Sequence, residues 1–353
     1  MTRFKIIIFL LSLLLSACGP STRPSDLAAQ PTAMPGTPGA VSLPAATLAG
    51  TQIILPMVMR GTEGSPTPAP TQPLPPTPLP TSTTAPTLTP EAPLRFAVIG
   101  DYGTGGQPEA DVAGLVAGWQ PELIISTGDN NYPTGSADTI DAHIGQFYHA
   151  YIYPYLGGYG AGADQNRFFP SLGNHDWGAP NAQPYLDYFT LPGNERYYDF
   201  TWGPVHFFAL DSDPNDPDGV GSSSPQAAWL QNKLAGSTSP WQVVYFHAAP
   251  YSSGTHGSTD WMRWPYKDWG ADAVLAGHDH TYERLSIDGL PYFVNGLGGG
   301  GIYQFLNIVD GSQVRYNADH GAMLVEATDS QITFQFISSQ GEVVDKYTVE
   351  KQQ

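Results

Sequence analysis

Two histidines separated by a single residue end an apolar run, in the segment Gly277-His278-Asp279-His280. Because side chains alternate along an extended chain, His278 and His280 can face the same side. Imidazole is the commonest metal ligand in proteins, so one short turn could serve two metal ions. Alone the pattern proves little, because a buried histidine is more often a hydrogen-bonded core residue.

Four earlier apolar runs also end in a carboxylate, an amide or an imidazole. The side chains at these ends are Asp101, Asp129, Asn174, His175 and His247. In open α/β sheets, active sites form beyond the carboxyl ends of the strands, where all of these residues fall. Oxygen and nitrogen ligands of this kind suit iron, zinc or manganese better than calcium. Each residue alone could cap a helix or form a turn, but together they predict a metal centre.

Strands and helices alternate before the last histidine pair. Apolar runs predict strands at 95–100, 123–126, 168–172, 241–247 and 271–276, and helical patterns lie at 109–119, 136–155, 226–234 and 260–267. A Gly-Pro turn between residues 197–202 and 205–210 predicts a hairpin. Only strands are expected afterwards, at 282–288, 290–295, 323–327, 332–337 and 343–349. This order predicts a layered α/β fold with mixed sheets.

Composition separates an amino-terminal region from one large domain. Residues 1–18 have the pattern of a signal peptide, and Leu15-Ser16-Ala17-Cys18 resembles a bacterial lipobox with a lipidated Cys18. An ordinary secretory signal or an uncleaved anchor helix are the alternatives, but the short apolar segment and the cysteine favour lipidation. Residues 19–93, rich in Pro and Thr, predict a disordered stalk. Residues 94–353 can bury the core of one catalytic domain.

The charge and the leader limit the location and the partners of the protein. The net charge of −18 disfavours nucleic acid and anionic lipid as partners. It would also repel phosphorylated substrates, so a phosphate site would need the local positive charge of bound metal. We expect an exported protein, lipid-anchored at the bacterial cell envelope, that contacts the membrane only through Cys18. An apolar island at 53–59 could be a sticky patch, a docked strand or a second membrane contact.

The ordered motifs resemble the purple acid phosphatases, within the calcineurin-like metallophosphoesterase superfamily. The matching segments are Gly100-Asp101-Tyr102-Gly103, Gly128-Asp129-Asn130-Asn131-Tyr132, Gly173-Asn174-His175-Asp176, Val243-Val244-Tyr245-Phe246-His247 and Gly277-His278-Asp279-His280. The resemblance begins near residue 94 and implies a metallophosphoesterase-type layered α/β sandwich, with two mixed β-sheets flanked by helices. Because the stalk occupies the place of an amino-terminal domain, the chain resembles the short, single-domain members.

The resemblance implies a dinuclear centre of Fe(III) and a second divalent metal, which would be Fe, Zn or Mn. The implied ligands are Asp101, Tyr132 and His280 for the ferric ion, Asp129 as the bridge, and Asn174, His247 and His278 for the second ion. Tyr132 distinguishes this subfamily from other metallophosphoesterases, because a phenolate stabilises trivalent iron. Asp279 is expected to support the centre rather than to bind metal.

His175 and His256 match the substrate-facing histidines of the family, although the loop around His256 aligns less securely. The implied reaction is hydrolysis of phosphate monoesters, on a small molecule or a peptide, with a metal-bound hydroxide as the nucleophile. An imidazolium that protonates the leaving group would contribute about 10²–10⁴-fold. The family pattern leaves open which of the two histidines supplies this proton.

Two other functions compete with this interpretation. A phosphodiesterase or nucleotide hydrolase could use the same metal centre, and a comparison of bis-nitrophenyl phosphate with the monoester would distinguish it. A non-catalytic surface binding module would be expected to lose metal ligands, whereas every ligand position is filled here. The segment 211–219 resembles a calcium loop superficially, but it lacks the terminal glutamate and predicts a capped turn instead.

Overall fold

The computed structural model describes residues 92–351. The expected signal peptide with Cys18, almost all of the expected stalk and the apolar island at 53–59 lie outside the described residues. Among residues 92–351, no helix has the length and apolar character needed to cross a membrane.

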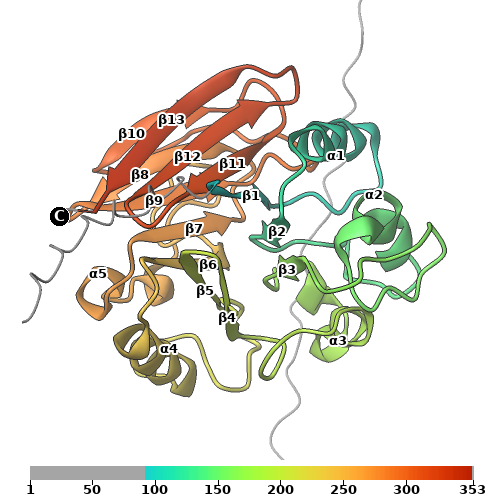
Figure 1. Ribbon diagram of the computed structural model, residues 1–353, viewed down its shortest axis with the longest axis horizontal. Coiled ribbons are helices and arrows are strands. Elements are labelled where there is room, and N and C mark those ends of the chain that lie inside the picture. The colour runs from blue at the N-terminus through green and yellow to red at the C-terminus, as the bar shows by residue number, and fades with distance from the viewer. Residues whose placement is uncertain (1–91, 352–353) are drawn as a thin grey trace, which may run out of the picture. The chain divides into compact units, whose positions relative to one another are not determined.

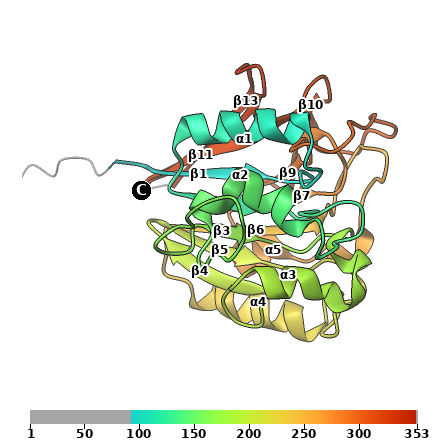
Figure 2. The same ribbon diagram turned by 90° about the vertical axis from the view of Figure 1, so that its right-hand side faces the viewer.

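Two β-sheets lie face to face at the centre of the domain (Figures 1 and 2). The first has the order β13-β12-β11-β1-β2-β3 and contains β1 (Leu94–Ile99), β2 (Leu123–Ser126), β3 (Phe168–Pro170), β11 (Gly321–Ala327), β12 (Gln331–Ser338) and β13 (Val343–Glu350). Its strands β1, β2 and β3 run parallel, whereas β11, β12 and β13 pair antiparallel.

The second sheet is also mixed. Its order is β10-β8-β9-β7-β6-β5-β4, with β4 (Tyr198–Trp202), β5 (Val205–Ala209), β6 (Trp241–Ala248), β7 (Ala273–Gly277), β8 (Tyr282–Ile287), β9 (Leu290–Asn295) and β10 (Ser312–Tyr316). The strands β5, β6, β7 and β9 run parallel, and β4, β8 and β10 pair antiparallel with their neighbours. The predicted architecture and the hairpin of β4 and β5 are therefore confirmed.

Helices cover the outer sides of the paired sheets (Figure 2). The longer ones are α1 (Gln107–Trp119) and α4 (Pro225–Gly236), and the short ones are α2 (Gln146–Tyr148), α3 (Gln183–Tyr188) and α5 (Tyr266–Trp269). α4 begins where Ser224 accepts a hydrogen bond from the backbone N–H of Ala227 (3.1 Å), with Pro225 in the first turn. Such a cap satisfies a backbone donor that the helix itself leaves free.

Strand β6 explains why the central strands have continuous apolar sequences. Val243 and Tyr245 belong to the core between the sheets, whereas Val244 and Phe246 pack in the layer under α4. Neighbouring side chains in a strand point to opposite faces, and both faces of this strand are buried.

Aromatic rings fill much of the space between the sheets. Phe207 of β5 lies edge-on to Phe96 of β1, with ring centroids 5.0 Å apart, and stacks on Phe200 of β4 at 4.8 Å. Further along, Tyr282 of β8 stacks on Phe336 of β12 at 4.2 Å. These contacts hold the two sheets together, because each ring packs against a ring of the opposite sheet or of a neighbouring strand.

Two expected helices are broken, for different reasons. Residues 136–155 form a π-helical turn at Asp141–Gly145, then α2 and a 3₁₀ turn. The π-helical turn forms because Asp141 accepts hydrogen bonds from the hydroxyls of Tyr155 and Tyr188, and these groups lie close to the backbone of Gly145. Residues 260–267 form a 3₁₀ turn and the start of α5, separated by Pro265, which cannot continue the hydrogen bonding.

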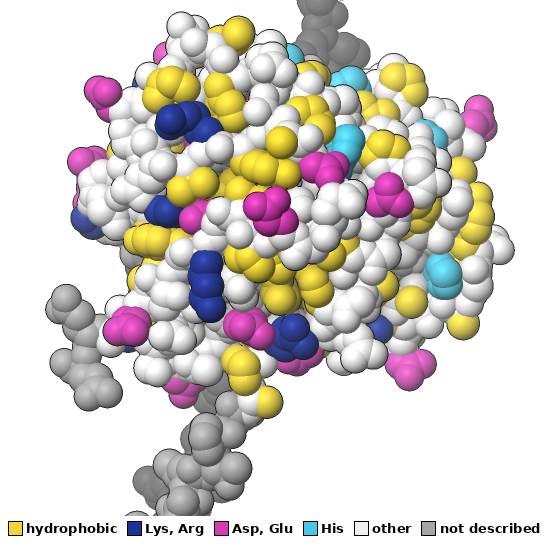
Figure 3. Space-filling model, turned by 90° about the horizontal axis from the view of Figure 1, so that it is seen from above, with side chains coloured by type: hydrophobic (Ala, Val, Ile, Leu, Met, Phe, Trp, Pro, Cys, Tyr) yellow, Lys and Arg dark blue, Asp and Glu magenta, His cyan; other side chains and the backbone are white. Residues whose placement is uncertain are grey.

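Strand β10 was not expected from the sequence. It is an edge strand with half-exposed and exposed residues, and it pairs only with β8. Only Val314 and Tyr316 alternate there with polar residues and pack on the core, and this pattern is too short to predict a strand. On the face shown in Figure 3, acidic, basic and apolar side chains are interspersed.

Removal of the Phe207 ring should destabilise the fold. Phe207 is fully buried, so Phe207→Ala should lower the free energy of unfolding by about 3–5 kcal/mol, as measured by urea denaturation. Leu306, with 60% of its surface exposed, provides the control, and Leu306→Ala should change the stability by about 0.5 kcal/mol or less. Equal losses in both variants would contradict the packing argument.

Candidate metal centre

The predicted metal-binding side chains lie together at one edge of the two sheets. The parallel strands β1, β2 and β3 of the first sheet and β6 and β7 of the second end at this edge. Backbone and side-chain contacts join the sheets there, since the N–H of His278 donates to Asp101 (3.1 Å) and Nδ1 of His247 lies 3.0 Å from the Thr127 carbonyl oxygen. The residues brought together are Asp101, Asp129, Tyr132, Asn174, His247, His278 and His280.

Three of these residues have a backbone conformation that side chains rarely adopt. The angle φ is +55° at Asp101, +53° at Asp129 and +72° at His278. Such conformations cost about 1–3 kcal/mol each and cluster at functional sites, where surrounding contacts hold them. Gly128 precedes one of them with φ +97°, and a Cβ atom there would lie 2.8 Å from the Cβ atom of His247. The left-handed turns are therefore a feature of the predicted site itself.

The first half of the cluster consists of Asp101, Asp129, Tyr132 and His280. Both carboxylates and His280 are buried, and their ligand atoms lie within 4.8 Å of one another. The hydroxyl of Tyr132 is 3.0 Å from Oδ2 of Asp129 and 3.0 Å from Nε2 of His280. Four donor atoms therefore surround one small space.

The second half consists of Asn174, His247 and His278, again with Asp129. Nε2 of His247 is 3.0 Å from Oδ1 of Asn174 and 3.2 Å from Nδ1 of His278. The same nitrogen is 3.3 Å from Oδ1 of Asp129. Because Asp129 turns Oδ2 toward Tyr132 and Oδ1 toward His247, it has one oxygen for each half, as a bridging ligand requires.

The hydrogen bonds of the histidines identify the nitrogens that are free to bind metal. Nδ1 of His247 donates to the Thr127 carbonyl, and Nδ1 of His280 donates to the Gly301 carbonyl at 2.6 Å. Each Nε2 then faces the cluster, where its neighbours are carboxylate, amide or hydroxyl oxygens. Either a proton or a metal ion can occupy this nitrogen and offset the negative charge of the carboxylates. The donor set therefore fits metal ions, with the backbone carbonyls fixing the rings.

The negative charges of the cluster act strongly on Tyr132. Burial, followed by the charges of Asp101 and Asp129, raises the pKa of the Tyr132 phenol far above its usual range. Burial also tends to raise the pKa of Asp129, but the adjacent His247 and His175 hold that pKa below its usual range. The Asp129 carboxylate therefore stays ionised, and the Tyr132 phenol stays neutral until a cation offsets the negative charge.

The two histidines of the second half have opposite pKa shifts. Burial lowers the pKa of His247, but the charge and hydrogen bond of Asp129 outweigh burial and raise this pKa to about 10. Burial and the neighbouring His247 lower the pKa of His278 to about 3. A proton on His247 thus serves as the cation of the metal-free cluster, and metal binding would release it.

His175 and His256 lie on two different sides of the cluster. The ring of His175 is 4.4 Å from the ring of Tyr132, and its Nε2 is 3.9 Å from Oδ2 of Asp129. The ring of His256 is exposed and stacks on His278, with centroids 4.3 Å apart. Both imidazoles therefore adjoin the cluster without taking part in its shortest donor contacts.

Tyr303 is a neighbour of the cluster that no sequence motif indicated. Its ring stacks on His280, with centroids 4.1 Å apart and an interplanar angle of 5°, and it meets His256 edge-on at 5.3 Å. The glycine run at 296–301, expected to form a permissive loop near the site, precedes it and lies against Asp101, whose carbonyl accepts the N–H of Gly300 (2.8 Å). An aromatic residue two positions after such a run is the sequence feature that could have indicated it.

The segment 211–219 is closed by protein groups instead of being arranged around a calcium ion. The guanidinium of Arg196 binds Asp216 through Nε at 2.9 Å and Asp218 through Nη2 at 2.9 Å. The alternate carboxylates that resembled calcium ligands are also engaged, since Asp211 accepts the indole N–H of Trp177 (2.9 Å) and Asp213 accepts the N–H of Asn215 (2.9 Å), as in the expected capped turn.

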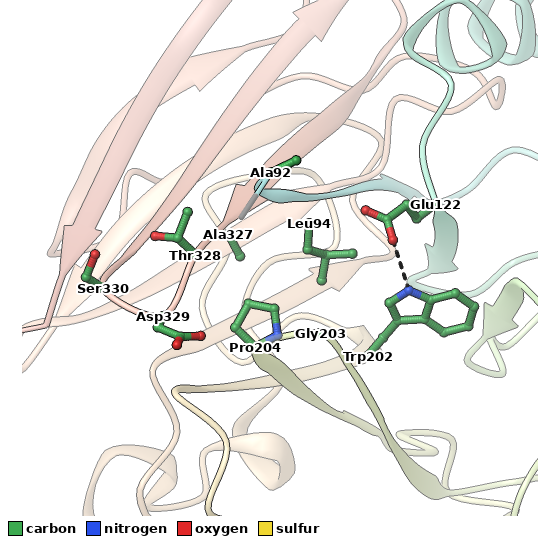
Figure 4. A pocket seen from close by; sticks show the side chains of 10 residues that line it. All are labelled: Ala92, Leu94, Glu122, Trp202, Gly203, Pro204, Ala327, Thr328, Asp329 and Ser330. Atoms are coloured by element: carbon green, nitrogen blue, oxygen red, sulfur yellow. Dashed lines mark hydrogen bonds between the residues drawn. The ribbon is translucent and has the colours of Figure 1, made fainter. Parts of the chain in front are cut away.

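A groove of about 670 Å³ lies at the opposite edge of the sheets (Figure 4). It is lined by the amino ends of β1 and β5 and by the turn after β11, and Trp202 donates there to Glu122 (3.3 Å). Its lining contains no histidine. The convergent donor atoms, not the size of the hollow, therefore mark the candidate site.

Comparisons with known proteins agree with this geometry. The sequence profile of the calcineurin-like phosphoesterases matches residues 94–282, more than half of the chain. Purple acid phosphatase 17 of Arabidopsis thaliana is 26% identical over 302 aligned positions, which cover 73% of this chain and 85% of that protein. Tartrate-resistant acid phosphatase type 5 of Mus musculus is 27% identical over 254 positions, covering 61% of this chain and 74% of that protein.

Two solved structures share the fold. The purple acid phosphatase PPD1 from yellow lupin (Lupinus luteus) seeds has a TM-score of 0.59 at 18% identity, covering 74% of this chain and 55% of that one. GAP50, the anchor in the inner membrane complex of Plasmodium, has a TM-score of 0.55 at 21% identity, covering 74% of this chain and 90% of that one. At these identities, both structures bear on the fold alone.

Metal binding should stabilise the protein through this cluster. With zinc at about 100 times its dissociation constant, the free energy of unfolding should rise by about 2.7 kcal/mol, because only the native state brings the donors together. The rise should disappear in the double variant His247→Ala/His280→Ala and persist in His206→Ala, which removes a histidine bound to Asp199 instead. Thermal unfolding with zinc and with a chelator measures it, and equal responses in all three proteins would refute the site.

Proposed function

This chain belongs to the calcineurin-like phosphoesterase family, and we propose that it is a metal-dependent phosphatase of the purple acid phosphatase type. It would hydrolyse phosphate monoesters on small molecules or peptides. The relatives named above, which are acid phosphatases, support the type of reaction. One observation carries the proposal for this chain: seven side chains that can bind metal converge at the strand ends, with their ligand atoms in mutual contact.

We propose a dinuclear centre of Fe(III) and a divalent Fe, Zn or Mn. Asp101, Tyr132 and His280 would hold the ferric ion, Asn174, His247 and His278 the divalent ion, and Asp129 would bridge them. The contact of the Tyr132 hydroxyl with both Asp129 and His280 supports this assignment, because a phenolate there would donate charge to a trivalent ion. When bound, the two ions would neutralise phosphate charge and would lower the pKa of a water that can attack phosphorus.

The protein's own side chains would orient the substrate and move protons. His175, beside Tyr132, and His256, beside His278, would contact the phosphate from two sides. The leaving alkoxide of a monoester is poor, so one of these imidazoles would give it a proton as the ester bond breaks. The Pro133 carbonyl lies 2.5 Å from Nδ1 of His175 and would fix the orientation of that ring.

We further propose that the protein is exported and lipid-anchored through Cys18, with the catalytic domain of residues 94–353 outside the cytoplasm. The leader and the lipobox-like sequence support this location. A substrate would then reach the site from the cell envelope or the medium, and the membrane would be contacted only through the lipid.

A phosphodiesterase or nucleotide hydrolase remains the second candidate, because the same metal centre could act on either ester. A binding module is a third, and the anchor GAP50 has the same fold. The complete donor set argues against a purely structural role here, since seven converging polar side chains with strained turns would have no use in an anchor.

The visible spectrum tests the ferric assignment. Aerobically purified protein should have a broad absorption band in the green-to-yellow region, from charge transfer between phenolate and Fe(III). Tyr132→Phe should lose this band while it keeps its fold, because only the hydroxyl is removed. A colourless wild-type enzyme that is active with zinc or manganese would refute the ferric centre and leave only the broader family.

The leaving group tests the role of His175. His175→Ala should slow the hydrolysis of alkyl phosphates by about 10²–10⁴-fold and that of nitrophenyl phosphate much less, because nitrophenolate needs little protonation. Steady-state kcat on both substrates, with His256→Ala as the matched variant, would show which imidazole has this dependence. Equal losses on both substrates in both variants would argue against an acid role for either residue.

A further inference from the structure

The loop that carries His256 is held by two buried carboxylates. Residues 252–258 follow β6 and lie beside the histidine turn of residues 277–280. Asp279 and Glu283 have no exposed surface and direct their oxygens at this loop. The metal-binding arrangement described above uses neither of them.

Asp279 binds the backbone on both sides of the His256 side chain. Its Oδ1 accepts the N–H of His256 at 2.8 Å, and its Oδ2 accepts the N–H of Gly257 at 3.1 Å. Oδ2 also accepts the hydroxyl of Ser252 at 2.5 Å. The carboxylate thus joins the start of the loop to the residue that adjoins the metal cluster.

Glu283 anchors the first part of the same loop. Its Oε2 accepts the N–H of Ser253 at 2.7 Å, and its Oε1 accepts the hydroxyl of Ser253 at 2.6 Å. The loop lies so close to the carboxylates that a Cβ atom at position 254 would be 2.4 Å from Cγ of Asp279. Only a glycine at position 254 allows this approach without displacing Asp279.

Polar contacts alone hold this loop, since the segment 304–309 adds only hydrogen bonds such as that from the N–H of Leu306 to the Ser253 carbonyl (2.9 Å) and that from the hydroxyl of Thr255 to the Gln304 carbonyl (3.1 Å). The loop sequence, Ser-Ser-Gly-Thr-His-Gly-Ser, contains no aliphatic or aromatic hydrocarbon side chain that could pack in a core. Ordering such a segment costs about 1–2 kcal/mol of backbone entropy per residue. Hydrogen bonds to ionised acceptors are among the strongest available to offset that cost.

We infer that Asp279 is a positioning residue that fixes His256 beside the metal cluster, and that Glu283 supports it by anchoring Ser253. The inference rests on the proposed function, in which His256 contacts the substrate. The histidine turn then has two uses. His278 and His280 face the cluster, while Asp279, between them, faces the loop, and the ring of His256 stacks on His278 itself.

Hydrogen–deuterium exchange tests the contacts without any need for activity. In Asp279→Ala, the amides of His256 and Gly257 should exchange about 10- to 100-fold faster, the loss expected for hydrogen bonds to a charged acceptor. Asp279→Asn keeps the volume and one acceptor, so it should have an intermediate effect even if the alanine variant folds poorly. Asp345→Ala is the matched control, because Asp345 is also buried but binds Arg284 and Tyr282 on the other face of β8.

A double-mutant cycle tests the positioning role. Asp279→Ala should lower kcat/KM for a phosphate monoester by about 10- to 100-fold in the wild-type background, because misplaced catalytic groups lose that much. In a protein that already carries His256→Ala, the further substitution Asp279→Ala should change kcat/KM by less than about twofold, since Asp279 acts through His256. The metal content of Asp279→Ala should equal that of the wild type.

The contacts, the positioning role and the proposed function can each be refuted by a different result. Unchanged exchange in residues 252–258 of both Asp279 variants would overturn the inferred contacts, whatever the activity. If the losses of kcat/KM in Asp279→Ala and His256→Ala multiply in the double variant, or if Asp279→Ala loses metal, the positioning role would be overturned. Metal-replete wild type that is inactive on every phosphoester would instead refute the proposed function, and the exchange result would still decide whether the carboxylates hold the loop.

Discussion

The electrostatic constraint at the strand ends governs the rest of this structure. The ligand atoms of Asp101, Asp129, Tyr132, His247 and His280 lie within 3.0–3.4 Å of their neighbours, and protons on Tyr132 and His247 offset the carboxylate charge while no metal ion is bound. The fold must hold these polar groups together away from water. It does so with left-handed turns after the strands and with backbone carbonyls that fix the imidazole rings. A binding site for positive charge is thus built before any metal ion arrives, and protons occupy it in the metal-free protein.

The double-sheet core provides the rigidity that such a site needs. Five parallel strands from two sheets contribute donors at one edge, so a slip between the sheets would separate the two halves of the cluster. The rings of Phe96 and Phe207, which meet across the sheets, oppose that slip. A close-packed interior has low compressibility, and small displacements of the metal-binding side chains are therefore costly. The core thus contributes to metal affinity, although none of its residues contacts the site.

The sequence was sufficient to predict the layered fold and the group of side chains at the strand ends, because both depend on local patterns. Apolar runs mark strands, and a polar residue after each run lies at the sheet edge. It was not sufficient for β10, an edge strand with only two alternating apolar residues, or for the π-turn at Asp141, which depends on tyrosines 14 and 47 residues away. The sequence also did not indicate Tyr303, because its contact with His280 follows from the path of the loop and not from a motif.

The turn with His278 and His280 combines a feature that the sequence predicts with a contact that only the structure shows. Alternation along the chain predicted that His278 and His280 share a face, and it implies that Asp279 must point the other way. What Asp279 meets there depends on the fold, because the loop with His256 lies some twenty residues earlier in the chain. A movement of this turn would therefore displace two candidate metal ligands and the candidate substrate contact together. The spacing of the ligands and the placement of His256 are consequently properties of one structural unit.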